Sequence, residues 1–223
     1  MLEHKNTRIL NQYSIHTQRD LLGELRSEIQ RSGIHKIVVL DDDPTGTQTV
    51  ANVPVYTGWD EESIKDIFAN EYLLNFILTN SRAFGEEKTV QVHQEIALNL
   101  KKSAAVTEKK YLLISRADST LRGHYPTETE VLRRELEKDN TICFDGEVIC
   151  PYFAEGGRYT IDNVHYVRYG SELIPAAETE FAKDETFGYH ESDLKKYIHE
   201  KTEGRFKEDE VVDISLEELS DVR

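Results

Sequence analysis

Cysteine, positive charge and long hydrophobic runs are all scarce in this 223-residue sequence. The two cysteines, Cys143 and Cys150, are spaced unlike a redox or zinc pair and stand among apolar residues, so we interpret both as reduced and mostly buried. No apolar run approaches the roughly 20 residues that span a bilayer, and the first residues lack the apolar core of a secretory signal. We therefore expect a cytoplasmic protein.

Lysine and arginine number 27 against 42 aspartates and glutamates, which gives a net charge of −15. Such a surface does not attract nucleic acid phosphates or anionic lipids, so we expect neither a nucleic acid nor a membrane partner. The eight histidines show no metal-ligand spacing along one helix, and no metal-ligating residue is predicted. A hydrophobic fraction of 38% and a charged fraction of 31% are typical of a folded globular chain.

Short β-branched runs predict strands, and helical periodicity separates the first three of them. The predicted strands are residues 36–40, 75–79, 110–115, 146–150 and 210–214, and the predicted helices are 61–70, 86–104 and 127–138. Continuously apolar strands that alternate with helices pair in parallel and have both faces covered. The sequence therefore predicts an α/β fold with an open, mostly parallel, three-layer α/β/α sheet.

An amino-terminal helical extension is predicted ahead of this sheet. Residues 17–33 read as one amphipathic helix whose apolar side, with Leu21, Leu22, Leu25 and Ile29, we expect to face inward. We therefore divide the chain into a helical extension over residues 1–33 and an α/β domain over residues 34–223.

The carboxy-terminal third carries a predicted hairpin and two predicted helices. Residues 158–169 alternate apolar and polar side chains around an Asp-Asn turn, which is typical of a β-hairpin inserted in the domain. A capped helix is expected over residues 192–202, and Ser215 with Glu218 indicates a capping box that opens a last helix.

Polar loops follow the first three predicted strands. They are residues 41–47 (DDDPTGT), 80–82 (NSR) and 115–123 (SRADSTLRG). The carboxyl ends of parallel strands open onto one edge of a sheet, so we expect the three loops to converge on one crevice. Each loop taken alone is equally compatible with a turn, a helix cap or a solvated arginine.

The residue types in these loops indicate the ligand. Three adjacent carboxylates, Asp41, Asp42 and Asp43, repel one another, and that cost is usually kept where hydroxyls, cations or protons meet them. Arginine forks bind a carboxylate, and carboxylates accept hydroxyl hydrogens, so the loops fit a small polyhydroxylated anion. Gly156, Gly157 and Arg158 are a further candidate, with ligand approach and hairpin entry as equal explanations.

One incomplete resemblance is to the haloacid dehalogenase family of phosphohydrolases. Asp41, Asp43 and Thr45 after an apolar strand resemble its first motif, and residues 76–80 (FILTN) resemble its second. Asp41 would then be the nucleophile and Asp43 the acid or base, with Mg²⁺ between them. No later apolar strand ends in the acidic pair that this family uses for Mg²⁺, since residues 210–214 offer Asp213 alone.

Three motifs taken together resemble the amino-terminal, sugar-binding domain of the four-carbon acid sugar kinase family. They are DDxxTG at residues 41–46, TNSR at 79–82 and DSTLRG at 118–123, and the likeness continues through residues 151–168. The resemblance implies a kinase that uses ATP and Mg²⁺ to phosphorylate the terminal hydroxyl of threonate, erythronate or 3-oxo-tetronate in sugar acid catabolism. It also implies a carboxy-terminal nucleotide-binding domain, which nothing in these residues resembles.

The resemblance implies roles for the loop residues within this kinase. Asp42 or Asp118 would accept the hydroxyl proton, and Arg82 with Arg122 would hold the substrate carboxylate. The full set of substrate-binding candidates is Asp41, Asp43, Thr45, Gly46, Asn80, Ser81, Arg82, Ser119, Thr120, Arg122, Gly123 and Arg158.

The isolated chain is expected to bind a sugar acid but to be inactive, because ATP and Mg²⁺ would be held mainly by the nucleotide-binding domain. A stand-alone sugar acid binding protein without catalysis would carry the same loops and stays an alternative, and a homodimer is left open.

Overall fold

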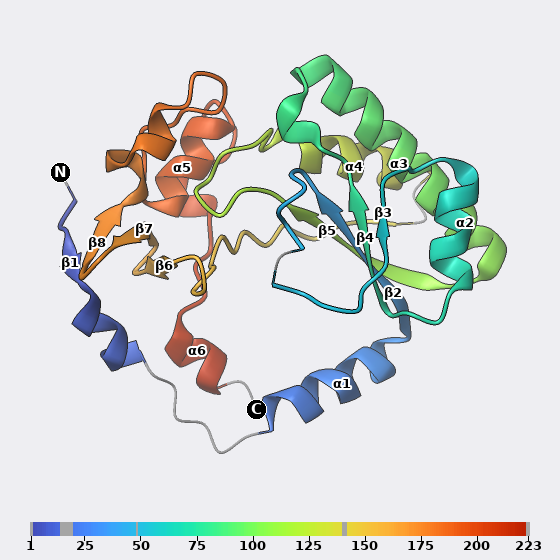
Figure 1. Cartoon of the computed structure of the whole chain (residues 1–223), viewed down its shortest axis with the longest axis horizontal. Coiled ribbons are helices and arrows are strands. Elements are labelled where there is room, and N and C mark those ends of the chain that lie inside the picture. The colour runs from blue at the N-terminus through green and yellow to red at the C-terminus, as the bar shows by residue number, and fades with distance from the viewer. Residues whose placement is uncertain (1, 14–19, 48, 140–141, 222–223) are drawn as a thin grey trace. The chain divides into compact units, whose positions relative to one another are not determined.

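The computed structural model describes residues 2–13, 20–47, 49–139 and 142–221. Its contacts divide the chain into two compact units (Figure 1). Unit 1 comprises residues 1–19, 118–122 and 148–223, and unit 2 comprises residues 20–117 and 123–147. The predicted division between residues 33 and 34 is a different one and stays a prediction.

Unit 2 is built on a four-stranded parallel sheet with the order β3-β4-β2-β5. Its strands are β2 (Ile34–Asp41), β3 (Val55–Tyr56), β4 (Leu74–Leu78) and β5 (Lys110–Arg116). The parallel pairing predicted for residues 36–40, 75–79 and 110–115 is confirmed. The sequence did not indicate β3, because two residues are too short to show a period.

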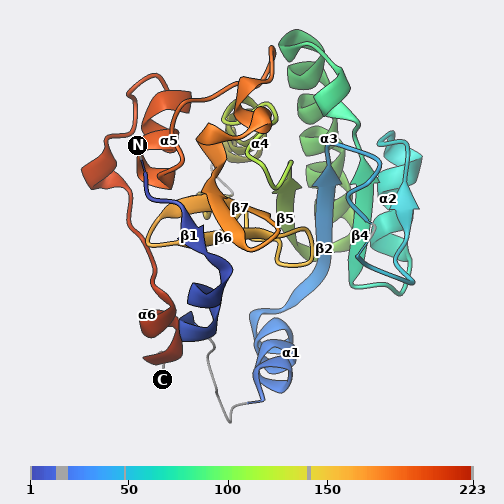
Figure 2. The ribbon, with the colours of Figure 1, turned by 60° about the vertical axis from the view of Figure 1, so that its left-hand side comes forward.

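The helices of unit 2 follow the predicted periodicity. They are α1 (Leu21–Ser32), α2 (Glu61–Ala69), α3 (Glu86–Thr107) and α4 (Thr127–Glu137), with a short 3-10 turn η2 (Ser81–Ala83). Helix α2 begins where the Asp60 carboxylate accepts hydrogen bonds from the N–H groups of Glu62 and Ser63. Helices α2, α3 and α4 share one core with the sheet (Figure 2), which includes Val38, Leu40, Ile64, Phe68, Ile77, Ile96, Leu100 and Leu132.

The α/β class is confirmed, and in unit 2 the crossover helices lie on one face of the parallel sheet. The two crossovers, β3-α2-β4 and β4-α3-β5, run in the same direction across the sheet, and right-handed connections then place both helices on the same face. On β5, Leu112 and Ile114 are exposed. The described part of unit 2 therefore packs its helical core on one face of the sheet.

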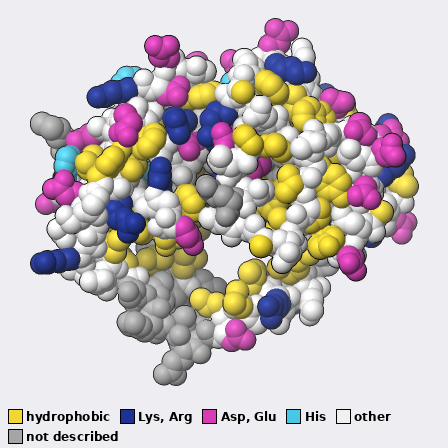
Figure 3. Space-filling model, in the orientation of Figure 1, with side chains coloured by type: hydrophobic (Ala, Val, Ile, Leu, Met, Phe, Trp, Pro, Cys, Tyr) yellow, Lys and Arg dark blue, Asp and Glu magenta, His cyan; other side chains and the backbone are white. Residues whose placement is uncertain are grey.

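Helix α1 lies between its predicted ends but does not pack as predicted. Asp20 caps its start, Gly33 ends it in the left-handed conformation (φ 68°), and residues 17–19 lie outside the described part. Leu21, Leu22 and Leu25 are exposed, so the prediction that they face inward is wrong. Hydrophobic side chains are visible at several places on the face drawn in Figure 3. An apolar stripe shows that a helix can bury one side, but it does not show that a partner is present.

Unit 1 contains an antiparallel sheet with the order β1-β8-β7-β6. Its strands are β1 (Lys5–Asn6), β6 (Arg158–Ile161), β7 (Val164–Tyr169) and β8 (Glu172–Pro175). The predicted hairpin is confirmed as β6 and β7, with Asp162 (φ 50°) and Asn163 (φ 66°) at its tip. Two positive φ angles match the tight turns that join twisted antiparallel strands.

Short helices complete unit 1. They are η1 (Thr7–Tyr13), η3 (Ala176–Glu178), η4 (Glu180–Lys183), α5 (Leu194–Lys201), η5 (Glu208–Glu210) and α6 (Leu216–Asp221). The predicted capping box is confirmed, because Ser215 N–H donates to Glu218 Oε2 (2.7 Å) and Glu218 N–H donates to Ser215 Oγ (3.1 Å). The cap of α5 is Asp193, one residue after the predicted start.

Three smaller predictions are wrong. Residues 146–150 and 210–214 form no strand, and Val148 is 87% exposed. A short apolar run becomes a strand only where a neighbouring strand offers hydrogen-bond partners, which a sequence pattern does not reveal. Cys143 and Cys150 are exposed instead of buried, because they lie in or beside this extended segment.

Candidate functional site

The first predicted loop starts at the end of β2, where Asp41 is the last strand residue and is almost fully buried. A Cβ atom on Gly46 would overlap the Asp41 carboxylate, so only glycine allows this turn to close over the aspartate. Asp43 accepts hydrogen bonds from the N–H and the hydroxyl of Thr45, which makes the turn that aspartate favours. Asp41 is thus covered by its own loop, which does not suit the nucleophile of a phosphohydrolase.

The second predicted loop is joined to the first by an ion pair. Arg82 Nε donates to Asp42 Oδ2 at 2.9 Å, and Arg82 Nη2 donates to Asp42 Oδ1 at 2.5 Å. Arg82 Nη1 also lies 3.4 Å from Asp43 Oδ2. The structure therefore confirms that these two loops meet, in a bidentate pair whose carboxylate side chain is only 2% exposed.

Arg116, the last residue of β5, is a charged neighbour that the predicted site residues did not include. Its Nη1 lies 3.3 Å from Asp41 Oδ1, and the two residues are register partners in the sheet. Burial raises the pKa of Asp41, and the Arg116 charge offsets part of this rise. A basic residue at the carboxyl end of a strand beside an aspartate-ended strand is the sequence signal that would have found this contact.

The remaining candidates in unit 2 belong to the loops that contain Asp42 and Arg82, or lie next to them. Ser81 is fully buried, and its hydroxyl donates to Glu128 Oε1 at 2.6 Å, so the structure commits it to an internal network. Asn80 is exposed in the left-handed conformation (φ 55°). Gly123 (φ 142°) would place a Cβ 3.4 Å from Asp42 Oδ2, which brings this glycine beside the carboxylate of the first loop.

The loop from Asp118 to Arg122 belongs to unit 1 and has its own ion pair. Arg122 Nε donates to Asp118 Oδ2 at 2.7 Å, and the Thr120 hydroxyl donates to the same oxygen. Leu121 N–H donates to the Asp118 carbonyl at 3.0 Å, with Leu121 in the left-handed conformation. The loop is thus wrapped around the Asp118 carboxylate. That it shares one crevice with the first two loops stays a prediction.

Three buried side chains hold successive carbonyl groups of this loop. His165 Nε2 lies 2.8 Å from the Ser119 oxygen, Tyr189 donates to the Thr120 oxygen (2.7 Å), and Tyr197 donates to the Leu121 oxygen (3.0 Å). Because a carbonyl only accepts, the His165 proton sits on Nε2. No sequence signal indicates these contacts, since His165, Tyr189 and Tyr197 lie 46, 69 and 76 positions after the residues whose carbonyl groups they hold.

Burial lowers the pKa of His165 to about 4, so the ring is neutral near pH 7. Its Nδ1 then accepts a hydrogen bond from the Thr160 hydroxyl at 2.9 Å. Burial raises the pKa of Tyr189, so its hydroxyl keeps the proton that it donates. These donors fix the position of the loop backbone, because they bind its carbonyl groups and not its charged side chains.

Two arginines of unit 1 stack on one aromatic ring. The Cζ atoms of Arg122 and Arg158 lie 5.0 Å and 5.5 Å from the centroid of the Phe181 ring. Arg122 Nη1 also lies 4.0 Å from an oxygen of Asp184. Their shared ring brings the two predicted site residues Arg122 and Arg158 close together, and their roles in binding stay a prediction.

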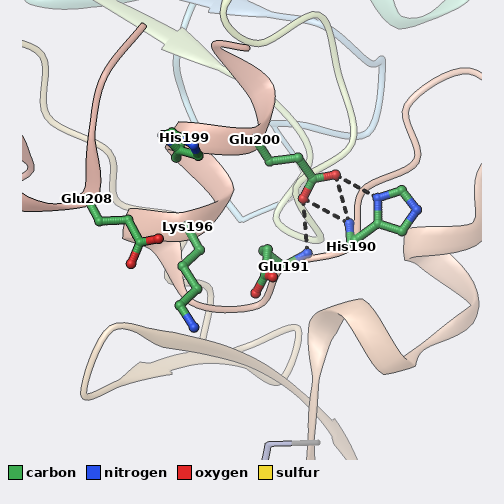
Figure 4. A pocket seen from close by; sticks show the side chains of 6 residues that line it. All are labelled: His190, Glu191, Lys196, His199, Glu200 and Glu208. Atoms are coloured by element: carbon green, nitrogen blue, oxygen red, sulfur yellow. Dashed lines mark hydrogen bonds and ion pairs between the residues drawn. The ribbon is translucent and has the colours of Figure 1, made fainter. Parts of the chain in front are cut away.

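A surface pocket of about 290 Å³ lies elsewhere in unit 1 and contains none of the predicted site residues. In it the Glu200 carboxylate points toward His190 and accepts hydrogen bonds from the N–H groups of His190 and Glu191 (Figure 4). Its polar groups therefore hold the chain ahead of α5. Its lining residues are His190, Glu191, Lys196, His199, Glu200 and Glu208.

Comparison with known families decides the assignment. A family model described as "sugar-binding N-terminal domain" matches residues 37–222. The chain belongs to this family. The match confirms the predicted relation to the amino-terminal domain of four-carbon acid sugar kinases, and it makes the chain a sugar-binding domain. No curated protein matches the sequence.

One solved structure is similar to this sugar-binding domain. It is a domain of unknown function (DUF1537) from Bordetella bronchiseptica, described as a domain-swapped dimer with bound citrate. The two share 23% sequence identity and a TM-score of 0.53, and the likeness covers 74% of this chain and 39% of that one. It therefore shows a common fold, and the chain spans well under half of the solved relative.

Two further properties of the described residues bear on partners. No helix among them has the length and apolar character needed to cross a membrane. They contain no group of three histidine, cysteine, aspartate or glutamate side chains placed to hold a metal ion. The carboxylates of the first loop do not fit Mg²⁺ either, because Asp41 is covered by Gly46 and both oxygens of Asp42 bind Arg82.

Proposed function

We propose that this sugar-binding domain binds a four-carbon sugar acid, namely threonate, erythronate or 3-oxo-tetronate, as the substrate half of an ATP-dependent kinase. The proposal depends on one observation: a chain that belongs to a family of sugar-binding domains contains two aspartate–arginine ion pairs in its predicted loops. These pairs are Asp42 with Arg82 and Asp118 with Arg122. Arginines recognise carboxylates and aspartates recognise hydroxyls, and a sugar acid carries both. The citrate named for the solved relative is likewise a hydroxy acid.

We propose Asp118 as the group that accepts the proton of the phosphorylated hydroxyl. Both oxygens of Asp42 bind the Arg82 guanidinium, and its side chain is 2% exposed, whereas 13% of the Asp118 side chain is exposed. A general base must reach the hydroxyl of its substrate, which favours the more exposed carboxylate. Arg122 then orients the anion, and Thr120 fixes the Asp118 carboxylate that receives the proton.

ATP and Mg²⁺ belong to this proposal through a carboxy-terminal nucleotide-binding domain. The carboxylates of the first loop do not fit a metal ion, so we assign no step to Mg²⁺ in this chain. Its own residues bind the acid, orient the terminal hydroxyl and accept the proton, which is the positioning that phosphoryl transfer requires.

Thermal unfolding of the chain with threonate, erythronate, 3-oxo-tetronate, Mg-ATP, or beryllofluoride with Mg²⁺ tests the proposal. A ligand at about 100 times its dissociation constant adds roughly 2.7 kcal/mol to the free energy of unfolding. We expect stabilisation by at least one sugar acid. Stabilisation by beryllofluoride with Mg²⁺ and by none of the acids would instead support a phosphohydrolase that uses Asp41.

The base assignment needs a turnover assay in which the nucleotide-binding domain is supplied. We expect Asp118→Asn to abolish phosphorylation of the acid while keeping measurable binding. Equal turnover in Asp118→Asn and the unsubstituted protein would remove Asp118 from this role.

A further inference from the structure

Arg158 is an arginine without a carboxylate partner among the described residues. Its Nη1 donates to the Gly156 carbonyl, and its Nε is buried with no hydrogen-bond partner. By contrast, Arg82, Arg116 and Arg122 each form an ion pair with an aspartate. A partly buried guanidinium is costly when no carboxylate forms an ion pair with it and one of its N–H groups has no acceptor, unless a ligand supplies a negative charge.

The surroundings of Arg158 strengthen this reading. Its guanidinium shares the Phe181 ring with Arg122, so two positive charges lie against one aromatic side chain. The nearby carboxylates have other partners: Asp118 and Asp184 lie beside Arg122, and Glu180 accepts the Tyr169 hydroxyl at 2.6 Å, although the Arg158 charge also acts on Glu180. None of these carboxylates forms an ion pair with the Arg158 guanidinium, which can therefore receive an anion that is not part of this chain.

Other groups near Arg158 do not supply that anion. His165 is buried and accepts a proton poorly, and the Arg158 charge is one cause of its lowered pKa. Lys183, in the same segment as Phe181, adds a further positive charge near Glu180. The arrangement favours an oxyanion, since the planar guanidinium fork matches a carboxylate or a phosphate.

We infer that Arg158 is a specificity-determining residue that binds the carboxylate of the sugar acid, with Arg122 on the same ring, and so selects the acid over a neutral sugar of equal length. This inference rests on the proposed function for the identity of the ligand. Carboxylate and phosphate share the recognised chemistry, so the experiment includes both.

The test is isothermal titration calorimetry of the full chain with erythronate, its neutral counterpart erythritol, and inorganic phosphate. The variants are Arg158→Gln, which removes the charge, and Arg158→Lys, which keeps the charge without the fork. Arg168→Gln is the matched control, because Arg168 is an exposed arginine of the same hairpin. Melting temperatures establish that each variant is folded.

We expect Arg158→Gln to weaken erythronate binding about 10- to 100-fold, the usual loss for hydrogen bonds to a charged group, and to change erythritol binding less than about twofold. Arg158→Lys should fall between this variant and the unsubstituted chain, and Arg168→Gln should bind normally. Equal losses for acid and polyol, or equal behaviour of the Arg158 and Arg168 variants, would overturn the inference. Should Arg158→Gln not fold, normal erythronate affinity in Arg158→Lys would overturn the role of the fork.

The two proposals fail in different ways. Erythronate binding that ignores Arg158 removes the inference and leaves the proposed function intact. Binding of phosphate, but of no sugar acid, in an Arg158-dependent manner removes the proposed function and keeps the oxyanion site. No binding of either anion to the unsubstituted chain contradicts both.

Discussion

Each unit of the chain contains an aspartate–arginine pair from a predicted loop, and the two pairs are built differently. Arg82 binds both oxygens of Asp42, whose side chain is 2% exposed. Arg122 binds one oxygen of Asp118, whose side chain is 13% exposed, and Arg122 itself stacks on an aromatic ring. The Asp42 carboxylate of the first pair is almost fully buried, whereas the second pair is partly exposed to solvent.

This difference separates two uses of the same residue types. A buried bidentate pair fixes two loops to each other, because breaking it leaves an uncompensated charge inside the protein. A partly exposed pair contributes little to stability, so its arginine can exchange contacts with a ligand. We therefore expect unit 2 to lose stability, and unit 1 to lose binding, when its arginine is removed.

The largest effect should come from Arg82→Ala. It leaves the buried Asp42 carboxylate unpaired, which should lower the free energy of unfolding by about 3–5 kcal/mol. Urea denaturation measures this loss. Arg122→Ala is the matched variant in unit 1 and should cost about 1 kcal/mol or less. Equal losses in the two variants would show that the two pairs do not differ in kind.

Acid should weaken unit 1 through His165. Its pKa is about 4 when folded and 6.5 in the unfolded chain, so the unfolded chain binds the proton first as the pH falls. This contribution to stability is complete above pH 6.5 and is lost toward pH 4, by about 3 kcal/mol. Urea denaturation at pH 7 and pH 4 should show a smaller pH-dependent loss in His165→Gln than in the unsubstituted chain.

His190→Gln is the control for this pH dependence, because the His190 side chain is 92% exposed. It should keep the acid sensitivity of the unsubstituted chain. The same acid sensitivity in His165→Gln would mean that other groups cause the loss.

The closed turn of unit 2 predicts the next effect. Gly46→Ala places a methyl group on the Asp41 carboxylate, and the resulting displacement should cost about 1–3 kcal/mol in urea denaturation. Gly146→Ala is the control, since a Cβ there meets no atom within 4 Å, and its stability should be unchanged or slightly higher. If the Gly46→Ala protein is as stable as the control, the Asp41 side chain can move aside without lowering the free energy of unfolding.

The smallest effect contrasts two tyrosine hydroxyl groups, those of Tyr189 and Tyr111. Tyr189→Phe removes the donor to the Thr120 carbonyl in unit 1 and should cost about 0.5–1.5 kcal/mol. Tyr111→Phe in unit 2 removes a buried hydroxyl that has no partner in the described structure, so thermal unfolding should show no loss. A larger loss in Tyr111→Phe than in Tyr189→Phe would contradict this contrast.

Much of the fold was predictable because local patterns encode it. The parallel strands, helices α2, α3 and α4, the hairpin and the capping box at Ser215 all follow from periodicity and turn chemistry. The wrong strands at residues 146–150 and 210–214, and the inward placement of Leu21, Leu22 and Leu25, required knowledge of a pairing or packing partner.

The candidate site was predictable to a similar degree. The meeting of Asp42 with Arg82 followed from the rule that parallel strands end at one edge. The contact of Arg116 with Asp41 was not predicted, although a basic residue at the end of the neighbouring strand is a signal for it; strand register then brings the two residues together. That residues 118–122 belong to unit 1 could not be predicted from the sequence. They directly follow residue 117, which belongs to unit 2, and no sequence feature marks the change of unit.

Composition and periodicity are local properties, and they were enough to predict the parallel α/β class, the acidic surface and the three loops rich in aspartate, hydroxyl groups and arginine. Tertiary packing was needed to learn which aspartates pair with Arg82, Arg116 and Arg122, and that Arg158 forms no ion pair with a carboxylate among the described residues. It also decided that His165, Tyr189 and Tyr197 hold the Ser119–Leu121 carbonyls. Such pairings depend on distance and burial between remote segments, which determine whether an opposite charge or a hydrogen-bond donor is within reach.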